Sequence, residues 1–297
     1  MMHNRLTGTG TALITPFTHD GKVDYPALEK LIDYQTHNGI DFLVALGTTG
    51  ESVTLTAEEK SKVISTFVNK KNGTPLVVGM GSNNTLALCD QIKNTDFTGI
   101  DAILSVVPYY NKPSQAGIYQ HFAAVAEASP VPVILYNVPG RTGTNMSAET
   151  TLKLAGDFEN IIAVKEASGD MSQIMDILRR KKDDFFLLSG DDALTFPMLG
   201  LGAEGVISVV ANVFPAHFAS MVINARGGNC DKAVEIHQAL LPFIDMLFKA
   251  GSPAGVKEAL SYLGFCDPSV RLPLAPISEE LKNKINTFAD HFSKTRI

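Results

Sequence analysis

One lysine in this sequence lies in an apolar segment, where its amine could act as a nucleophile. Lys165 is part of Ile161-Ile-Ala-Val-Lys-Glu-Ala-Ser168, a segment with the composition of a buried strand. Residues two apart share a strand face, so Ala163 and Ala167 are expected beside Lys165, leaving space around its amine. Burial disfavours the charged form of a lysine, and a neutral amine attacks carbonyl carbons. The alternative is an ion pair between Lys165 and a carboxylate at the strand end.

Three further segments place polar and aromatic residues directly after apolar runs. Gly47-Thr-Thr-Gly-Glu51 can form a tight turn whose N–H groups and hydroxyls suit a carboxylate or phosphate. Pro108-Tyr-Tyr-Asn-Lys-Pro113 supplies two phenols, and Tyr136-Asn-Val-Pro-Gly-Arg-Thr142 combines a possible proton relay with an anion-binding arginine. Taken singly, each is better explained as structure: a helix-capping turn, a packed surface loop, or a core tyrosine with a surface ion pair.

The residues that position these segments form short apolar runs alternating with helical patterns. Continuous hydrophobicity is typical of parallel strands that are covered on both faces. Eight such runs are present: Thr11–Phe17, Phe42–Gly47, Pro75–Gly81, Ala102–Pro108, Val131–Val138, Ile161–Ala167, Phe185–Gly190 and Gly205–Val210. Eight strand–helix units predict an α/β fold, a (β/α)8 TIM barrel. An open doubly wound sheet is the alternative, because counting strands does not show closure.

Helix signals complete the expected organisation. Thr56-Ala-Glu-Glu-Lys60 has the cap residue and acidic first turn of a helix start, and Ser147 and Ser172 are candidate starts for two others. Near the C-terminus, Lys232–Lys249 is strongly helical, with Ile236, Leu240, Phe243 or Ile244, and Leu247 on one face. A break at Gly251–Gly255 and a proline-rich segment at Pro268–Pro276 separate further helices. We therefore expect a barrel over residues 1–226 and a C-terminal helical domain over residues 227–297.

Barrel enzymes keep their chemistry at the carboxyl ends of the strands. The polar segments follow the second, fourth, fifth and sixth runs, so a lysine, phenols, threonine hydroxyls and an arginine should meet there. Such a set predicts carbonyl chemistry on a carboxylated substrate. No metal is expected, because the seven histidines lack paired ligand spacing, and Gly79-Met-Gly81 is an incomplete dinucleotide fingerprint. Asp191-Asp192 could attract a cation, although a structural role in the turn is favoured.

Composition narrows the class of protein further. The chain has 297 residues and a net charge of −6 without a basic stripe, which argues against binding nucleic acid through its phosphates. Three scattered cysteines form neither a disulfide framework nor a zinc motif and fit a reducing compartment. The apolar stretch 206–225 is interrupted by polar residues and reads as strand, turn and helix. With no apolar signal core in residues 1–10, the cytoplasm is the expected location.

Five motifs in this sequence match the motifs of a known family and occur in the same order. The motifs are Gly47-Thr-Thr-Gly-Glu-Ser52, Pro108-Tyr-Tyr-Asn-Lys-Pro-Ser-Gln115, Tyr136-Asn-Val-Pro-Gly-Arg-Thr142, Val164-Lys-Glu-Ala-Ser-Gly169 and Ser189-Gly-Asp-Asp192. Together they resemble the dihydrodipicolinate synthase family of pyruvate-dependent class I aldolases. The similarity extends from Gly8-Thr-Gly-Thr-Ala12 to Arg271-Leu-Pro-Leu274.

The resemblance implies a role for each candidate residue. Lys165 would form an imine with pyruvate, and Tyr136 would be the general acid and base. Thr48 and Thr49 would hold the pyruvate carboxylate, with Thr48 also linking two phenols in a proton relay. The remaining assignments follow from the same likeness: Tyr110 as the other relay phenol, supplied by a neighbouring subunit; Arg141 for the carboxylate of aspartate semialdehyde; and Gly190 and Ile207 lining the pyruvate pocket.

The resemblance also implies what the protein would need and with what it would assemble. The expected reaction joins pyruvate to L-aspartate 4-semialdehyde in the diaminopimelate route to lysine, without a metal or other cofactor. A homotetramer built from two dimers is expected. The alternatives are an N-acetylneuraminate lyase-like aldolase, against which Gly140-Arg-Thr142 argues, and a catalytically silent barrel that binds a carboxylate.

Two departures from the family pattern have consequences. Ser252-Pro-Ala-Gly-Val-Lys257 lacks the Asn and the second Pro that often precede the last helices, which concerns a detail of the C-terminal region. The positions matching the effector site of lysine-inhibited members hold Lys60 or Ala57, and Ala87, in place of a histidine and a glutamate, although Ser52, Asn83 and Tyr109 remain. We therefore expect weak or absent feedback by lysine.

Overall fold

Eight parallel strands close into a barrel in the order of the sequence, which confirms the (β/α)8 prediction and excludes the open sheet. The structure is a computed structural model that describes residues 3–295. The strands are β1 (Gly8–Ala12), β2 (Phe42–Ala45), β3 (Leu76–Gly79), β4 (Ala102–Val106), β5 (Val133–Asn137), β6 (Ile161–Glu166), β7 (Phe186–Ser189) and β8 (Gly205–Ser208). Closure is made by β1 and β8, where Gly8 pairs with Gly205 and Thr11 with Ser208.

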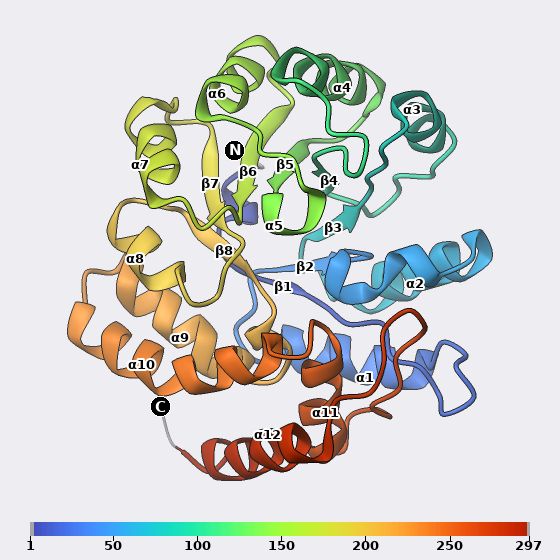
Figure 1. The fold of residues 1–297 in the computed structure, drawn as a ribbon, viewed down its shortest axis with the longest axis vertical. Coiled ribbons are helices and arrows are strands. Elements are labelled where there is room, and N and C mark those ends of the chain that lie inside the picture. Colours follow the sequence, from blue (N-terminus) through green and yellow to red (C-terminus); the bar gives the residue numbers. More distant parts are fainter. Residues whose placement is uncertain (1–2, 296–297) are drawn as a thin grey trace.

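Helices surround the strands on the outside (Figure 1). Those of the barrel are α1 (Tyr25–Thr36), α2 (Ala57–Lys70), α3 (Thr85–Lys93), α4 (Gln115–Ala128), α5 (Pro139–Thr142), α6 (Ala148–Asp157), α7 (Met171–Arg180), α8 (Thr195–Gly200) and α9 (Pro215–Arg226). Short 3-10 turns are η1 (His3–Leu6), η2 (Thr48–Gly50), η3 (Ser52–Thr54) and η4 (Val210–Asn212). Stretch 206–225 is thus strand, turn and helix, as predicted. Within residues 3–295, no helix is long and apolar enough to cross a membrane.

The strands are buried on both faces, which explains their unbroken hydrophobicity. Side chains that point inward fill the barrel, among them Phe42, Val44, Ile134, Ile162 and Ile207. A second, larger apolar cluster lies between the strands and the helices around them. A packed interior leaves only the ends of the barrel open to chemistry.

The first strand was predicted wrongly, as Thr11–Phe17 instead of Gly8–Ala12. After Ala12 one ladder bond to β2 remains, from Leu13 N to Val44 O at 3.0 Å. The Asn212 side chain binds the neighbouring backbone groups: its Nδ2 donates to Ala12 O at 2.8 Å, and its Oδ1 accepts from Ile14 N at 3.0 Å. Pro16 has no N–H to donate to a neighbouring strand. The segment that forms β1 is rich in glycine and threonine and lacks the branched apolar residues that are typical of a buried strand.

Two of the three predicted helix starts are confirmed. Thr56 caps α2 in a capping box with Glu59, and Ser147 accepts from Thr150 N at the start of α6. The third is wrong, because α7 is capped by Asp170, whose carboxylate accepts from the N–H groups of Ser172 and Gln173. An aspartate outcompetes a serine two residues later when it reaches two free N–H groups at once.

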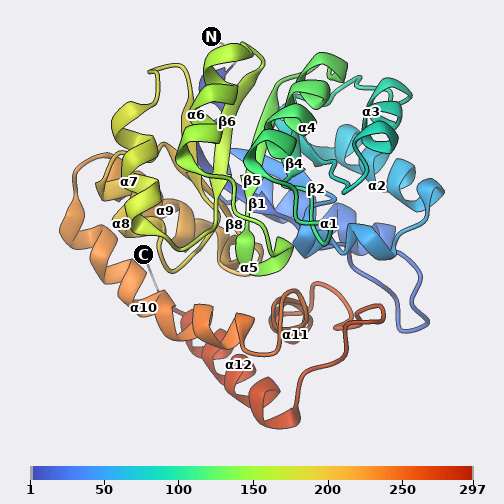
Figure 2. The ribbon, with the colours of Figure 1, turned by 45° about the horizontal axis from the view of Figure 1, so that its top comes forward.

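The C-terminal helices gather on one side of the barrel (Figure 2). They are α10 (Cys230–Phe248), α11 (Ala254–Tyr262) and α12 (Glu279–Phe292), and the predicted apolar face of α10 is buried. Phe243 of α10 contacts Phe214 before α9 and stacks on Phe288 of α12, each at 5.0 Å between ring centroids. The predicted break at Gly251–Gly255 is too long, since α11 begins at Ala254. The domain boundary at 226/227 stays a prediction, and residues 296–297 lie outside the described residues.

Candidate active site

Lys165 lies near the carboxyl end of β6 and points into the barrel. Its side chain is only 5% exposed, and Ala163 and Ala167 belong to the same interior cluster, as the alternation of the strand predicted. Its Nζ lies 4.3 Å from the centroid of the Tyr136 ring, and these two residues are register partners on β6 and β5. Among residues 3–295, no carboxylate lies within ion-pair distance of this amine. The alternative of an ion pair at the strand end is therefore wrong.

A second buried lysine in the same chain shows what a structural lysine looks like. Lys257 is completely buried, and its Nζ contacts Glu51 Oε1 at 2.5 Å and Ser269 O at 2.9 Å. Burying an ammonium without such partners costs several kcal/mol, roughly, even after relaxation. Lys165 is buried without such partners, so its amine is free to attack a carbonyl carbon that enters the cavity.

The space around Lys165 depends on Gly190, at the end of β7. A Cβ atom added there would lie 2.7 Å from Ala167 Cβ and 3.0 Å from Lys165 Cε. Any larger residue would therefore push on the stem of the lysine. Ile207, the other residue predicted for the pocket wall, is buried in the barrel interior.

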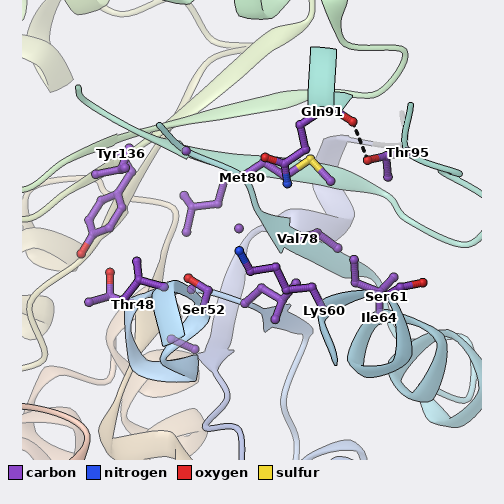
Figure 3. Close-up of a pocket in the computed structure, with 18 of the residues that line it drawn as sticks. Thr48, Ser52, Lys60, Ser61, Ile64, Val78, Met80, Gln91, Thr95 and Tyr136 are labelled. Atoms are coloured by element: carbon purple, nitrogen blue, oxygen red, sulfur yellow. Dashed lines mark hydrogen bonds between the residues drawn. The ribbon is translucent and has the colours of Figure 1, made fainter. Parts of the chain in front are cut away.

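Thr48 and Thr49 lie in the 3-10 turn that follows β2. Glu51 N donates to Thr48 O at 3.1 Å, and Thr15 Oγ1 donates to Gly50 O at 2.7 Å. Thr48 is exposed to the cavity side and Thr49 is buried. In Figure 3 the hydroxyl end of Tyr136 is directed toward Thr48. The turn does not cap the next helix, because Thr56 does so.

Four predicted site residues, Thr48, Tyr136, Arg141 and Lys165, line one cavity of about 1340 Å³. The cavity continues away from the barrel past Ser52 and along α2 to the end of α3. In Figure 3, the amine of Lys60 points into this outer part. The cavity is therefore larger than a three-carbon acid needs, and its outer part is open to a second molecule.

Arg141 stands on the short helix α5 at the rim of this cavity and is exposed. Within the described part of the chain its guanidinium has no ion-pair or hydrogen-bond partner. A free guanidinium at the mouth of a cavity can bind a carboxylate in bidentate fashion.

Tyr110 is not brought to Lys165 within one chain. Its side chain is 88% exposed and its backbone has a positive φ of 74°, whereas the preceding residue, Tyr109, lines the cavity. Val53 and Leu86 are also strongly exposed apolar side chains, at 83% and 72%. Among the predicted site residues, Tyr110 is therefore one that the fold of a single chain leaves outside the cavity.

Two acidic residues at strand ends support the site without entering the cavity. Glu166, next to Lys165, accepts from Asn137 Nδ2, Ser168 N and Gln173 Nε2, and its burial raises the pKa of the carboxyl. Asp192 accepts from the N–H groups of Val209 and Val210 at 3.0 Å. Burial raises the pKa of Asp192 to about 6. The structural interpretation of Asp191-Asp192 is thus confirmed.

Sequence reasoning missed the purpose of Gly79 and the wall residue Met80. A Cβ atom at Gly79 would lie 2.3 Å from Leu46 O, so the glycine lets β3 approach the chain just before the threonine turn. Met80 lines the cavity (Figure 3). The signal in the sequence is Gly79-Met-Gly81, whose glycines permit a close approach of the backbone and do not mark a nucleotide-binding loop. Among residues 3–295, no group of three or more His, Cys, Asp or Glu is placed to hold a metal ion.

The chain is similar to known proteins in both sequence and fold. A sequence model described as "Dihydrodipicolinate synthetase family" matches residues 5–291. The 4-hydroxy-tetrahydrodipicolinate synthase of Parabacteroides distasonis is 54% identical over 272 residues, which cover 91% of this chain and 92% of that protein. The dihydrodipicolinate synthase of Aquifex aeolicus superposes with a TM-score of 0.93 at 42% identity, covering 97% of this chain and 98% of that one. The chloride-inhibited enzyme of Acinetobacter baumannii, solved with pyruvate, gives 0.94 at 36% identity, covering 98% and 100%.

Proposed function

The chain belongs to the dihydrodipicolinate synthetase family and is a lyase of the class I aldolase type, and we propose that Lys165 carries its covalent chemistry. The reaction joins pyruvate to L-aspartate 4-semialdehyde in the diaminopimelate route to lysine. The observation that supports this assignment is the buried amine of Lys165, which has a phenol beside it, no counter-ion among the described residues, and a cavity in front of it.

The first half of the reaction makes an electron-rich carbon from pyruvate. The Lys165 amine attacks the ketone carbon, and the resulting carbinolamine loses water to give a protonated imine. Tyr136 supplies the proton that lets hydroxide leave as water. The imine then accepts the electron pair released when a proton leaves the methyl group, which gives an enamine. Positioned acid–base help of this kind is worth roughly 10²- to 10⁴-fold in rate.

The second half forms the new carbon–carbon bond and frees the lysine. The enamine carbon attacks the aldehyde carbon of the second substrate, and the aldehyde oxygen takes a proton through Tyr136 and Thr48. The amino group of that substrate then attacks the imine carbon and displaces the Lys165 amine, closing the ring. One water molecule is released in all.

Substrate binding follows from the charges of the two acids. The hydroxyl and N–H groups of the Thr48–Thr49 turn suit the pyruvate carboxylate. Gly190 leaves space beside the Lys165 stem, and Ile207 is buried in the barrel interior. Arg141, free at the rim, suits the carboxylate of aspartate semialdehyde. The reaction as written needs no metal or other cofactor, and the cytoplasm is the proposed location.

Assembly belongs to the same proposal. Tyr110 is exposed in one chain and would complete the proton relay in a neighbouring copy, with the exposed side chains of Val53 on η3 and Leu86 on α3 as apolar contacts. A dimer is then the smallest active unit, and a tetramer would be a pair of such dimers. The protein should therefore lose activity when diluted below its dimer dissociation constant.

Reduction with borohydride in the presence of pyruvate tests the proposal. A mass increase that maps to Lys165, and that is absent from Lys165→Ala, is the expected result. Addition of aspartate semialdehyde before the reductant should then consume the enamine. No adduct on the folded protein would overturn the aldolase assignment and favour a carboxylate-binding barrel. An adduct without condensation would point to a different aldehyde, as in the N-acetylneuraminate lyase-like alternative.

A further inference from the structure

The turn that holds Thr48 and Thr49 is anchored from the far end of the chain. Glu51, directly after the turn, is only 3% exposed. Its Oε1 accepts from Lys257 Nζ at 2.5 Å, and its Oε2 accepts from Arg271 N at 3.0 Å. Lys257 lies on α11 and Arg271 in the segment between α11 and α12. Both oxygens of one carboxylate are therefore bound by the C-terminal region, which lies beside α1 (Figure 1).

The same contacts extend along the chain that leaves the turn. Arg271 Nη1 donates to Thr54 O at 2.8 Å, and Thr54 Oγ1 donates to Glu51 O at 3.0 Å. Lys257 Nζ and the Arg271 guanidinium both lie over the Phe17 ring, at 3.9 Å and 4.4 Å from its centroid. The segment 51–54 is thus fixed by charged groups against a buried aromatic surface.

Glu51 needs this anchoring because of its backbone. It has φ 49° and ψ 35°, the left-handed conformation that residues other than glycine rarely adopt. Such a conformation persists only where the surrounding structure determines it, and it is common at sites of function. If the carboxylate were released, Glu51 could return to an ordinary backbone conformation, and we expect that change to displace Thr48 and Thr49, which are joined to it through Gly50.

We propose that Lys257 is a positioning residue, which acts through Glu51 to hold the Thr48–Thr49 turn in the geometry that binds the carboxylate of the substrate. The inference rests on the proposed function, because the substrate carboxylate is that of pyruvate. Lys257 itself does not line the cavity and touches no substrate. Its effect is therefore expected in pyruvate affinity more than in the rate of imine formation once pyruvate is bound.

Lys257→Met, Glu51→Gln and the double variant test this coupling. The readout is the pyruvate concentration that gives half-maximal borohydride trapping on Lys165, together with the trapping rate at saturation. Loss of well-placed carboxylate hydrogen bonds should raise the half-saturating concentration about tenfold in each single variant. The saturating rate should change much less. The double variant should be no worse than the worse single variant, since both changes break one contact.

Lys181→Met is the matched control. Lys181 pairs with Glu204 at 2.6 Å, and both side chains are largely buried, but this pair lies where β7 and β8 begin, at the end of the barrel opposite the site. The control should lower the melting temperature without changing pyruvate affinity. All measurements are made well below the lowest melting temperature, with near-ultraviolet circular dichroism as the test of folding. If Lys257→Met does not fold, Glu51→Gln, which keeps the size of the side chain, decides the question.

Three results would overturn the inference while leaving the proposed function intact. The first is an unchanged pyruvate affinity in a folded Lys257→Met or Glu51→Gln protein. The second is a double variant whose loss of affinity is the product of the two single losses. The third is a loss of affinity in Lys181→Met as large as that in Lys257→Met. Absence of a Lys165 adduct in the unmodified protein is a different result, because it overturns the proposed function and this inference together.

Discussion

Gly190→Ala is the substitution whose effect follows most directly from the geometry. The added methyl group would lie 2.7 Å from Ala167 Cβ, whereas ordinary contacts begin at 3.4 Å, so one of the two must move by about 0.7 Å. It would also lie 3.0 Å from Lys165 Cε. Ala167 Cβ is fixed by its backbone, so the backbone at Gly190 must shift to clear it. The overlap with Lys165 Cε, about 0.4 Å, can be relieved by rotation of the lysine stem, which displaces the Lys165 amine.

The size of the effect can be bounded from this displacement. Forcing a methyl group into a packed interior typically costs about 1–3 kcal/mol of stability, which a barrel of this size tolerates. Misplacing a reacting group by about 1 Å costs about a hundredfold in rate. We therefore expect Gly190→Ala to fold and to form the Lys165 adduct with pyruvate about 10- to 100-fold more slowly.

Time-resolved trapping measures this directly. Protein and pyruvate are mixed with reductant, samples are stopped at intervals, and the adduct is quantified by intact mass and located by peptide mapping. Gly156→Ala is the control, because a methyl group at that position in α6 meets no atom within 4 Å. It should react at the unmodified rate and gain up to about 1 kcal/mol in stability from its helix propensity. A folded Gly190→Ala protein that reacts as fast as the control would refute the reasoning.

Further substitutions probe other parts of the site. Tyr136→Phe should slow turnover by about 10²- to 10⁴-fold with an unchanged melting temperature, and a smaller loss in a steady-state assay would exclude a general acid–base role. Arg141→Ala should raise the KM for aspartate semialdehyde about tenfold and leave pyruvate trapping unaltered; equal losses for both substrates would contradict its assignment. Free lysine should inhibit weakly or not at all, and a sub-millimolar inhibition constant would disprove that expectation. Because burial raises the pKa of Asp192 from 3.8 to about 6, the protonated form is favoured in the folded state, and its stabilising effect is lost as the pH rises from about 4 to 6. Between pH 4 and pH 7, the unmodified protein should therefore lose roughly 3 kcal/mol of unfolding free energy relative to Asp192→Asn, measured by denaturant unfolding. A difference between the two proteins that does not change with pH would contradict the raised pKa of Asp192.

Much of the fold and the reactive centre could be predicted from local patterns. Strands β2 to β8 are continuous apolar runs, and such runs are visible without knowing their neighbours. Lys165 stood out because a charged residue in such a run conflicts with its surroundings, and that conflict is itself the signal. Thr48 and Tyr136 followed from their positions at strand ends, since parallel strands deliver those ends to one face.

What could not be predicted depends on partners that are distant in sequence. β1 ends where it does because of Asn212, 200 residues away from Ala12. From its local sequence, Glu51 is predicted only as part of a polar turn. Its ion pair with Lys257 joins residues 206 positions apart, and neither local segment indicates that the pair forms. The exposure of Tyr110, in contrast to its neighbour Tyr109 in the cavity wall, is likewise not indicated by the local sequence.

Closure of the barrel has to wait until its last strand, β8, has been synthesised. One side of β1 pairs with β8, so residues 8–11 find their final partners only after residues 205–208 have been made. At about 5–20 residues per second, that edge of the nascent sheet stays unpaired for roughly 10–40 seconds on the ribosome. An unpaired edge is a template for pairing with other chains. The two glycines of β1, which weaken it as a strand, limit that hazard during the interval before closure.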